Sequence, residues 1–140
     1  MNESSVPPSG ITPSEPTLFF DENVSDRIVR ALRALEHDVV HLLDEFERGT
    51  PDVRFLPAIG DKGWFLVTQD KRIRSRPHER RALLGAGVGA FVFTGRAERS
   101  TDELAILILK HLQRIKELAA KTERPFIFGI SDRGKFERLT

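Results

Sequence analysis

Three aspartates stand where an α/β chain usually leaves a strand or enters a helix. Asp21 follows the apolar residues 18–20, Asp70 follows the apolar run that ends at Thr68, and Asp52 comes directly after a Thr-Pro pair. Because the carboxyl ends of parallel strands share one edge of a sheet, Asp21 and Asp70 are expected to converge. Gathered carboxylates repel each other, and a hard divalent cation such as Mg²⁺ neutralises them with the oxygen ligands that it prefers. The three aspartates therefore predict a metal site.

A basic segment follows Asp70 and extends to residue 81. Its single acid is Glu79, and its cations are Lys71, Arg72, Arg74, Arg76, Arg80 and Arg81. Most charge clusters are solvated helix faces on which both signs mix. The excess of one sign beside a predicted metal site instead favours a surface that binds a phosphodiester polymer.

Strands and helices must alternate along the chain to position these residues. The expected strands are the apolar runs 18–20, 39–42, 64–68, 90–93 and 126–130, each bounded by turn or helix signals. Strands that alternate with helices predict an α/β fold. Its sheet is expected to be mainly parallel and five-stranded, covered by helices on both faces and joined by right-handed crossovers.

Helices are expected near residues 25–35, near 51, over 77–84 and from 100 onwards. In the second of these, Thr50 is the expected N-cap and Pro51 the first helical residue, and Pro57 ends or kinks the helix within about two turns. The last helix begins with a capping-box pattern from Ser100 to Glu103. Its expected buried stripe is Leu104, Ile108, Leu112, Ile115 and Leu118.

Length and composition favour one folded domain. Residues 1–17 hold prolines among serines and threonines and no aromatic residue, so they predict a disordered tail before a domain at 18–140. A chain of 140 residues can bury a real core. The formal net charge is only +1, so any case for nucleic acid depends on how the charge is distributed.

The absence of cysteine excludes disulfides and thiolate metal sites. No apolar run approaches the length of a membrane span, and the first residues lack a secretory signal, so we expect a cytoplasmic protein without a membrane partner. The four histidines show no pair at the spacing of a zinc helix. We therefore expect them to be surface or core residues.

Four short motifs follow one another between residues 18 and 130. They are Phe20-Asp21-Glu22-Asn23, His37-Asp38-Val39-Val40, Thr50-Pro51-Asp52 and Val67-Thr68-Gln69-Asp70-Lys71. In order and residue type the chain resembles the PIN-like nuclease domains, in particular the VapC-type toxins of toxin-antitoxin pairs. This resemblance implies a PIN-like three-layer sandwich around the parallel sheet.

The resemblance also implies an activity. Asp21, Asp52 and Asp70 would hold Mg²⁺ or Mn²⁺ and activate water to cut RNA, and Glu22 is either a further ligand or a solvated residue. Asn23 and Thr68 would position water or phosphate oxygens. The RNA backbone would be held by Lys71, Arg72, Arg74 and Arg76.

Partners follow from the same resemblance. A toxin ribonuclease implies a cognate antitoxin that covers the acidic site, while the oligomeric state, a homodimer included, stays open. Many PIN nucleases carry a fourth acid shortly after the third. Here the residues after Asp70 are basic, and the next acids are Glu79, Glu98 and Asp102.

Two other hypotheses stay open. A phosphoacceptor receiver domain also places acids after its first and third strands and would use Thr94 after the fourth. Receivers need a lysine directly after the fifth strand, however, and here Lys135 comes well beyond Ile130. A degenerate PIN-like domain that binds RNA or a protein without cutting has the same sequence pattern as an active one.

Overall fold

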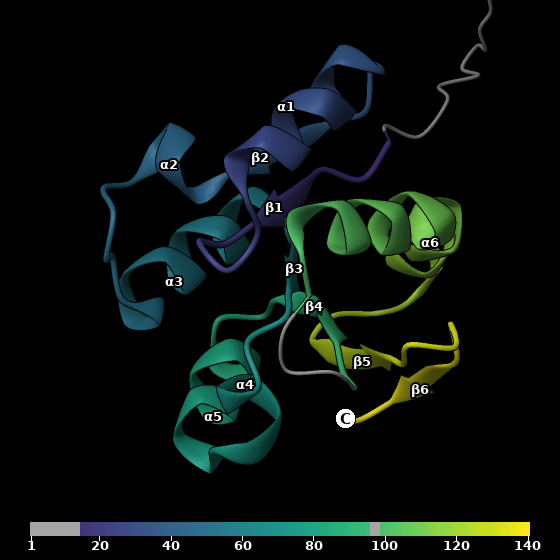
Figure 1. Ribbon diagram of the computed structural model, residues 1–140. Helices are drawn as coiled ribbons and strands as arrows, with labels where there is room; N and C mark the ends of the chain where they lie inside the picture. The colour runs from purple at the N-terminus through teal and green to yellow at the C-terminus, as the bar shows by residue number, and fades with distance from the viewer. Residues whose placement is uncertain (1–14, 96–98) are drawn as a thin grey trace, which may run out of the picture.

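A six-stranded sheet forms the centre of the fold in the computed structural model, which describes residues 15–95 and 99–140 without the side chain of Arg74 (Figure 1). The strand order is β2-β1-β3-β4-β5-β6. The first five strands are parallel, and β6 runs antiparallel to β5. The strands are β1 Leu18–Phe20, β2 Val39–His41, β3 Phe65–Thr68, β4 Gly89–Phe93, β5 Phe126–Ile130 and β6 Phe136–Arg138.

The predicted α/β fold with a mainly parallel sheet is confirmed, but the sheet has one strand more than expected. β6 is three residues long and partly or fully exposed. It has no apolar run of its own, and its register is set by pairing Phe136 with Ile130 and Arg138 with Phe128. A strand that forms through such edge pairing leaves little signal in its own sequence.

Helices cover both faces of the sheet, which gives the expected three layers. One hydrophobic cluster joins the sheet to α1 and α6, and a second joins it to α2, α3, α4 and α5. Figure 1 shows α4 and α5 at the opposite end of the molecule from α1. The helices are α1 Asp26–Ala34, α2 Leu42–Glu45, α3 Asp52–Lys62, α4 Arg72–Ser75, α5 Pro77–Gly85 and α6 Thr101–Lys121.

Alternation along the strands divides the core between the two faces. In β1, Leu18 and Phe20 pack into the cluster with α1 and α6, while Phe19 packs into the other cluster. Phe19 lies 5.5 Å from the ring of Phe55 and 6.3 Å from that of Trp64, measured between centroids. Burial of each such side chain contributes roughly 1.5–3 kcal/mol. The strands are therefore fixed in register by both faces.

The prediction that Pro57 can end the second helix within about two turns is wrong. α3 continues through Pro57 to Lys62 and ends at Gly63, whose φ of 73° is left-handed. A proline inside a helix costs about 3 kcal/mol or more, but Phe55, Leu56 and Ile59 are all buried on this helix. Their burial exceeds the cost of the proline, so tertiary packing decides the length of α3.

The start of α3 is shifted by one residue from the prediction. Pro51 is the N-cap and Asp52 the first helical residue. The Thr50 hydroxyl donates to the carbonyl of Glu47, at 2.6 Å, instead of capping the helix. Asp52 therefore lies in the first turn, where a negative charge is favourable to the helix dipole.

The signals for the other long helices are confirmed. Ser25 caps α1 through the backbone N–H of Arg27, at 3.2 Å. At the start of α6 both bonds of the capping box form between Ser100 and Glu103. The expected stripe of α6 is buried from Leu104 to Leu118. The four-residue helices α2 and α4 were not expected, because they are too short for a periodic pattern.

Most of the predicted tail, residues 1–14, lies outside the described residues. Glu15 pairs with Lys116, and the Thr17 hydroxyl donates to Asp38 Oδ2 at 2.7 Å. The Thr17 carbonyl also accepts from the backbone N–H of Phe65, at 3.0 Å. Residues 15–17 are thus held against the folded domain by these contacts. None of the helices that the structure describes is long and apolar enough to cross a membrane.

Candidate functional site

Asp21 is buried at the carboxyl end of β1. Because Phe20 of β1 pairs with Val67 of β3, Asp21 lies next to Thr68, whose hydroxyl donates to Asp21 Oδ2 at 2.5 Å. Asp21 Oδ1 accepts from the backbone N–H of Asn23, at 3.1 Å. Burial raises the pKa of the Asp21 carboxyl to about 6, although the hydrogen bonds from Thr68 and Asn23 oppose this shift.

Asp70 lies two residues beyond the end of β3. Its backbone N–H donates to the hydroxyl of Thr68, at 3.0 Å, so the Thr68 hydroxyl contacts both Asp21 and Asp70. Burial raises the pKa of the Asp70 carboxyl, but the hydrogen bonds and charge of Arg72 outweigh this effect and hold the pKa below its usual value. Asp70 is therefore a stably ionised carboxylate.

Asp52 faces the same region from the first turn of α3. Burial raises the pKa of its carboxyl, the negative charge of Asp70 raises it further, and the positive charge of Arg72 opposes the shift. Asp70 likewise acts to raise the pKa of Asp21. Asp70 therefore lies close enough to Asp21 and to Asp52 for its charge to act on both.

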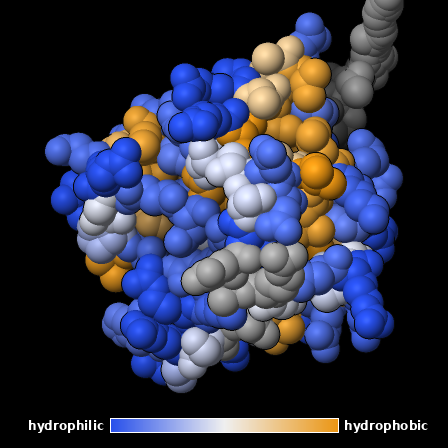
Figure 2. All heavy atoms as spheres, in the orientation of Figure 1, coloured by the Kyte–Doolittle hydropathy of each residue, from blue (hydrophilic) through white to orange (hydrophobic). Residues whose placement is uncertain are grey.

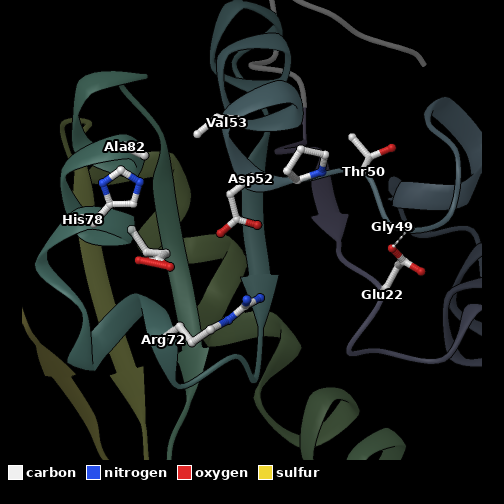
Figure 3. A pocket seen from close by; sticks show the side chains of 10 residues that line it. Glu22, Gly49, Thr50, Asp52, Val53, Arg72, His78 and Ala82 are labelled. Carbon is white, nitrogen blue, oxygen red and sulfur yellow. Dashed lines mark hydrogen bonds between the residues drawn. The ribbon is translucent and has the colours of Figure 1, made fainter.

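A pocket of about 440 Å³ opens beside Asp52. In Figure 3 the carboxylate of Asp52 and the guanidinium of Arg72 point toward each other in this pocket. Glu22 lies on another side of it, where its Oε1 accepts from the backbone N–H of Gly49 at 2.6 Å. The lining is completed by Thr50, Pro51, Val53, His78, Glu79 and Ala82.

Glu79 is a site residue that the sequence analysis did not assign. It lines the pocket from the first turn of α5, and its charge acts to raise the pKa of Asp52. Its Oε1 lies 3.8 Å from Arg76 Nη1, whereas its Oε2 is buried without a hydrogen-bond partner in the described part of the chain. Pro77 at the start of α5 places Glu79 in the first helical turn.

The chemistry of these donors fits a hard divalent cation. Carboxylates from Asp21, Asp52, Asp70 and Glu79 are the oxygen ligands that Mg²⁺ and Mn²⁺ take, and the buried Glu79 Oε2 is an acceptor without a partner among the described atoms. Within residues 15–95 and 99–140, however, no three acids or histidines stand close enough to hold an ion together. Binding of a cation would therefore require these carboxylates to move closer to one another.

The predicted basic residues have different surroundings. Arg72 lines the pocket and is half exposed, whereas Arg76 is 62% exposed and Lys71 is exposed at the start of α4. Arg74 belongs to α4, but its side chain is not among the described ones. The surface over α4 and α5 is largely hydrophilic in Figure 2.

A second polar network supports the loop after β1. Gln69 Nε2 donates to the carbonyl of Asn23 at 2.8 Å, and Gln69 Oε1 accepts from Arg99 at 3.3 Å. Arg99 is 3% exposed and also contacts Asp132 Oδ1 at 2.6 Å. Asn23 thus holds Asp21 with its backbone N–H and accepts from Gln69 with its carbonyl. No sequence pattern predicted roles for Gln69 or Arg99, which come together only through the fold.

Residues 16–95 match a family model whose description is "PIN like domain". The matched segment contains β1 to β4 and every residue that lines the pocket. No curated protein and no solved structure was found to match the chain.

Proposed function

The chain belongs to the PIN-like domain family, and we propose that it is a Mg²⁺- or Mn²⁺-dependent endoribonuclease. The proposal is carried by one observation: Asp52 and Glu79 line one pocket, and the negative charge of Asp70 acts on both Asp52 and Asp21 at the carboxyl edge of the sheet. These four carboxylates come from two strand ends and two helix starts. Arg72 balances part of this negative charge by pairing with Asp70, and a bound cation would balance the rest.

The residues of the chain have distinct roles in this proposal. When bound, a divalent cation lowers the pKa of a water ligand and withdraws charge from a phosphate oxygen. Asp52 and Glu79 would hold it from the pocket, and Asp70 from beyond the end of β3. Asp21 would hold it from the end of β1, where Thr68 and Asn23 fix both of its oxygens.

The substrate surface would be formed by α4 and α5. Lys71 and Arg76 are exposed beside the pocket, where they can contact phosphates without being needed for the fold. Arg74 of the same helix would join them. Contacts of this kind position a nucleic-acid backbone and do not read its sequence, so we expect broad sequence tolerance in binding.

A toxin role is the finer part of the proposal. The resemblance to VapC-type toxins supports it, because an unrestrained ribonuclease would damage its own cell. The antitoxin would cover the pocket, and a basic side chain that it inserts between Asp52 and Glu79 would neutralise the carboxylates.

RNA binding without cleavage is the second function with an observation in its favour. Arg72 holds both oxygens of Asp70, as a permanent replacement for a metal ion would. The receiver hypothesis gains no comparable support, since the family match is to a PIN-like domain and the chain after β5 continues into the antiparallel β6.

The test is RNA cleavage by the purified protein with Mn²⁺ or with EDTA. We expect cleavage only with Mn²⁺, and a large loss in Asp52→Asn and Asp70→Asn, which keep side-chain size and remove one charge. Gln113→Ala on α6, an exposed residue far from the pocket in sequence and layer, serves as the matched control. Binding of RNA by all variants with no cleavage by any would favour the second function.

A further inference from the structure

Arg72 forms a bidentate ion pair with Asp70. Arg72 Nε lies 3.0 Å from each carboxylate oxygen, and Arg72 Nη2 lies 2.6 Å from Oδ2. The backbone N–H of Arg72 adds a bond of 3.0 Å to Oδ1. Both oxygens of Asp70 are therefore engaged, in the bidentate geometry that makes arginine–carboxylate pairs strong.

The position of the guanidinium matters as much as the pair. Arg72 lines the pocket with Asp52 and Glu79, and in Figure 3 it points at Asp52. The side chain of Asp70 is only 9% exposed, whereas that of Arg72 is 50% exposed. The arginine thus covers the carboxylate from the solvent side and has room to leave it.

A guanidinium in this place competes with a divalent cation. Both need the oxygens of Asp70, and two positive charges held a few ångströms apart repel each other. A phosphodiester offers the guanidinium the same pair of oxygens that the carboxylate offers. A phosphate of the RNA backbone can therefore take Arg72 away from Asp70.

We propose that Arg72 is an exchangeable counter-ion that couples RNA binding to metal binding. Without RNA, Arg72 stays on Asp70 and weakens the site for a divalent cation. When a backbone phosphate binds, Arg72 transfers to it and Asp70 becomes available to the cation. This inference rests on the proposed function and adds a regulation to it: the enzyme loads its metal efficiently only when substrate is present.

Mn²⁺ affinity, measured from the electron paramagnetic resonance signal of free Mn²⁺, tests this without any need for cleavage. We expect Arg72→Gln to bind Mn²⁺ about tenfold more tightly than the wild type, which lies within the usual size of coupling between two sites. Arg72→Lys keeps the charge but loses the bidentate geometry. Its Mn²⁺ affinity should therefore lie between those of the wild type and Arg72→Gln. Arg54→Gln removes an exposed charge from α3 and should behave as the wild type.

Adding a single-stranded DNA oligonucleotide tests the exchange itself. It should tighten Mn²⁺ binding by the wild type about tenfold and leave Arg72→Gln unchanged. A methylphosphonate oligonucleotide of the same sequence, which lacks the phosphate charges, should have no effect on either. Gel analysis after each titration verifies that the DNA is intact, and thermal unfolding verifies that each variant is folded.

The outcomes separate this inference from the proposed function. The role of Arg72 is overturned if the wild type and Arg72→Gln bind Mn²⁺ with equal affinity, or if the DNA tightens Mn²⁺ binding equally in both. Either result leaves the proposed metal site unaffected. Tighter binding by Arg72→Gln with no RNA cleavage by any variant supports the exchange and overturns the nuclease. Absence of Mn²⁺ binding in every variant overturns both.

Discussion

Thr68 donates its hydroxyl hydrogen to Asp21 Oδ2 at 2.5 Å and thereby joins the end of β3 to the end of β1. The oxygen of the Thr68 hydroxyl in turn accepts from the backbone N–H of Asp70, at 3.0 Å. Thr68 is fully buried, so water cannot replace either bond. One hydroxyl thus fixes the relative positions of two of the carboxylates on which the proposed chemistry depends.

Thr68→Val removes this hydroxyl while nearly preserving shape. The buried Asp21 carboxylate and the part-buried backbone N–H of Asp70 lose their partner, and the loss of a buried partner costs about 1–3 kcal/mol. We expect a lower free energy of unfolding in urea and a loss of RNA cleavage beyond what stability explains. Thr68→Ser is the control because it keeps the hydroxyl and removes one methyl group. Equal activity in the two variants would show that the hydroxyl does not position the site.

Asp21 makes the stability of the fold depend on pH. Its pKa rises from 3.8 in the unfolded chain to about 6 in the folded protein. Between these values the folded state holds more protons than the unfolded state, so the stability decreases as pH rises. The difference amounts to about 3 kcal/mol once the pH exceeds the folded pKa.

The measurement is urea unfolding of the wild type and Asp21→Asn without metal, from about pH 4 to about pH 7. Because Asn does not titrate, the stability of the wild type minus that of the variant isolates Asp21. We expect this difference to fall by about 2 kcal/mol over the range, because part of the change takes place below pH 4. A difference that rises with pH would mean that the folded protein favours the charged form of Asp21.

The sequence predicted the parts of the fold that local pattern controls. Strand ends at Phe20 and Ile130 and the capping box at Ser100 agree with the structure, because apolar runs and caps are local signals. Convergence of Asp21 and Asp70 followed from the rule for parallel strands. The continuation of α3 through Pro57 could not be predicted, because the sequence alone does not show that the apolar face of this helix is buried.

The side-chain partners within the site could not be predicted from the sequence either. The basic segment suggested that Arg72 holds phosphate, whereas the structure places its guanidinium on Asp70. Glu79 reaches the pocket because α5 begins at Pro77, after a short helix that the pattern did not reveal. Such pairings depend on the angle between elements and on side-chain conformation, and neither is encoded in spacing alone.

Salt dependence tests the proposed RNA surface on α4 and α5. Each phosphate contact on a single strand contributes about 0.7 to the slope of log affinity against log salt. Lys71→Gln and Arg76→Gln should each flatten the slope by about that amount, for RNAs of different sequence alike. Binding is measured in an Asp52→Asn background so that RNA stays intact. Arg114→Gln on α6 is the control, and a slope unchanged in all variants would place the RNA elsewhere.

Growth of cells that express the protein tests the toxin role. We expect the wild type to slow growth and Asp70→Asn to be harmless at equal expression, because the variant lacks one of the proposed metal ligands. Protein levels are compared by immunoblot. Equal growth with both proteins would argue against a toxin while leaving the nuclease chemistry open.

The central claim is that carboxylates from β1, α3 and the end of β3 share one divalent cation. A crystal of the protein soaked in Mn²⁺ and measured for anomalous scattering tests it most directly. We expect an anomalous peak bound by oxygens of Asp21, Asp52 and Asp70, with the Arg72 guanidinium displaced from Asp70. The claim is contradicted if no peak forms at these carboxylates at saturating Mn²⁺ and Arg72 remains on Asp70.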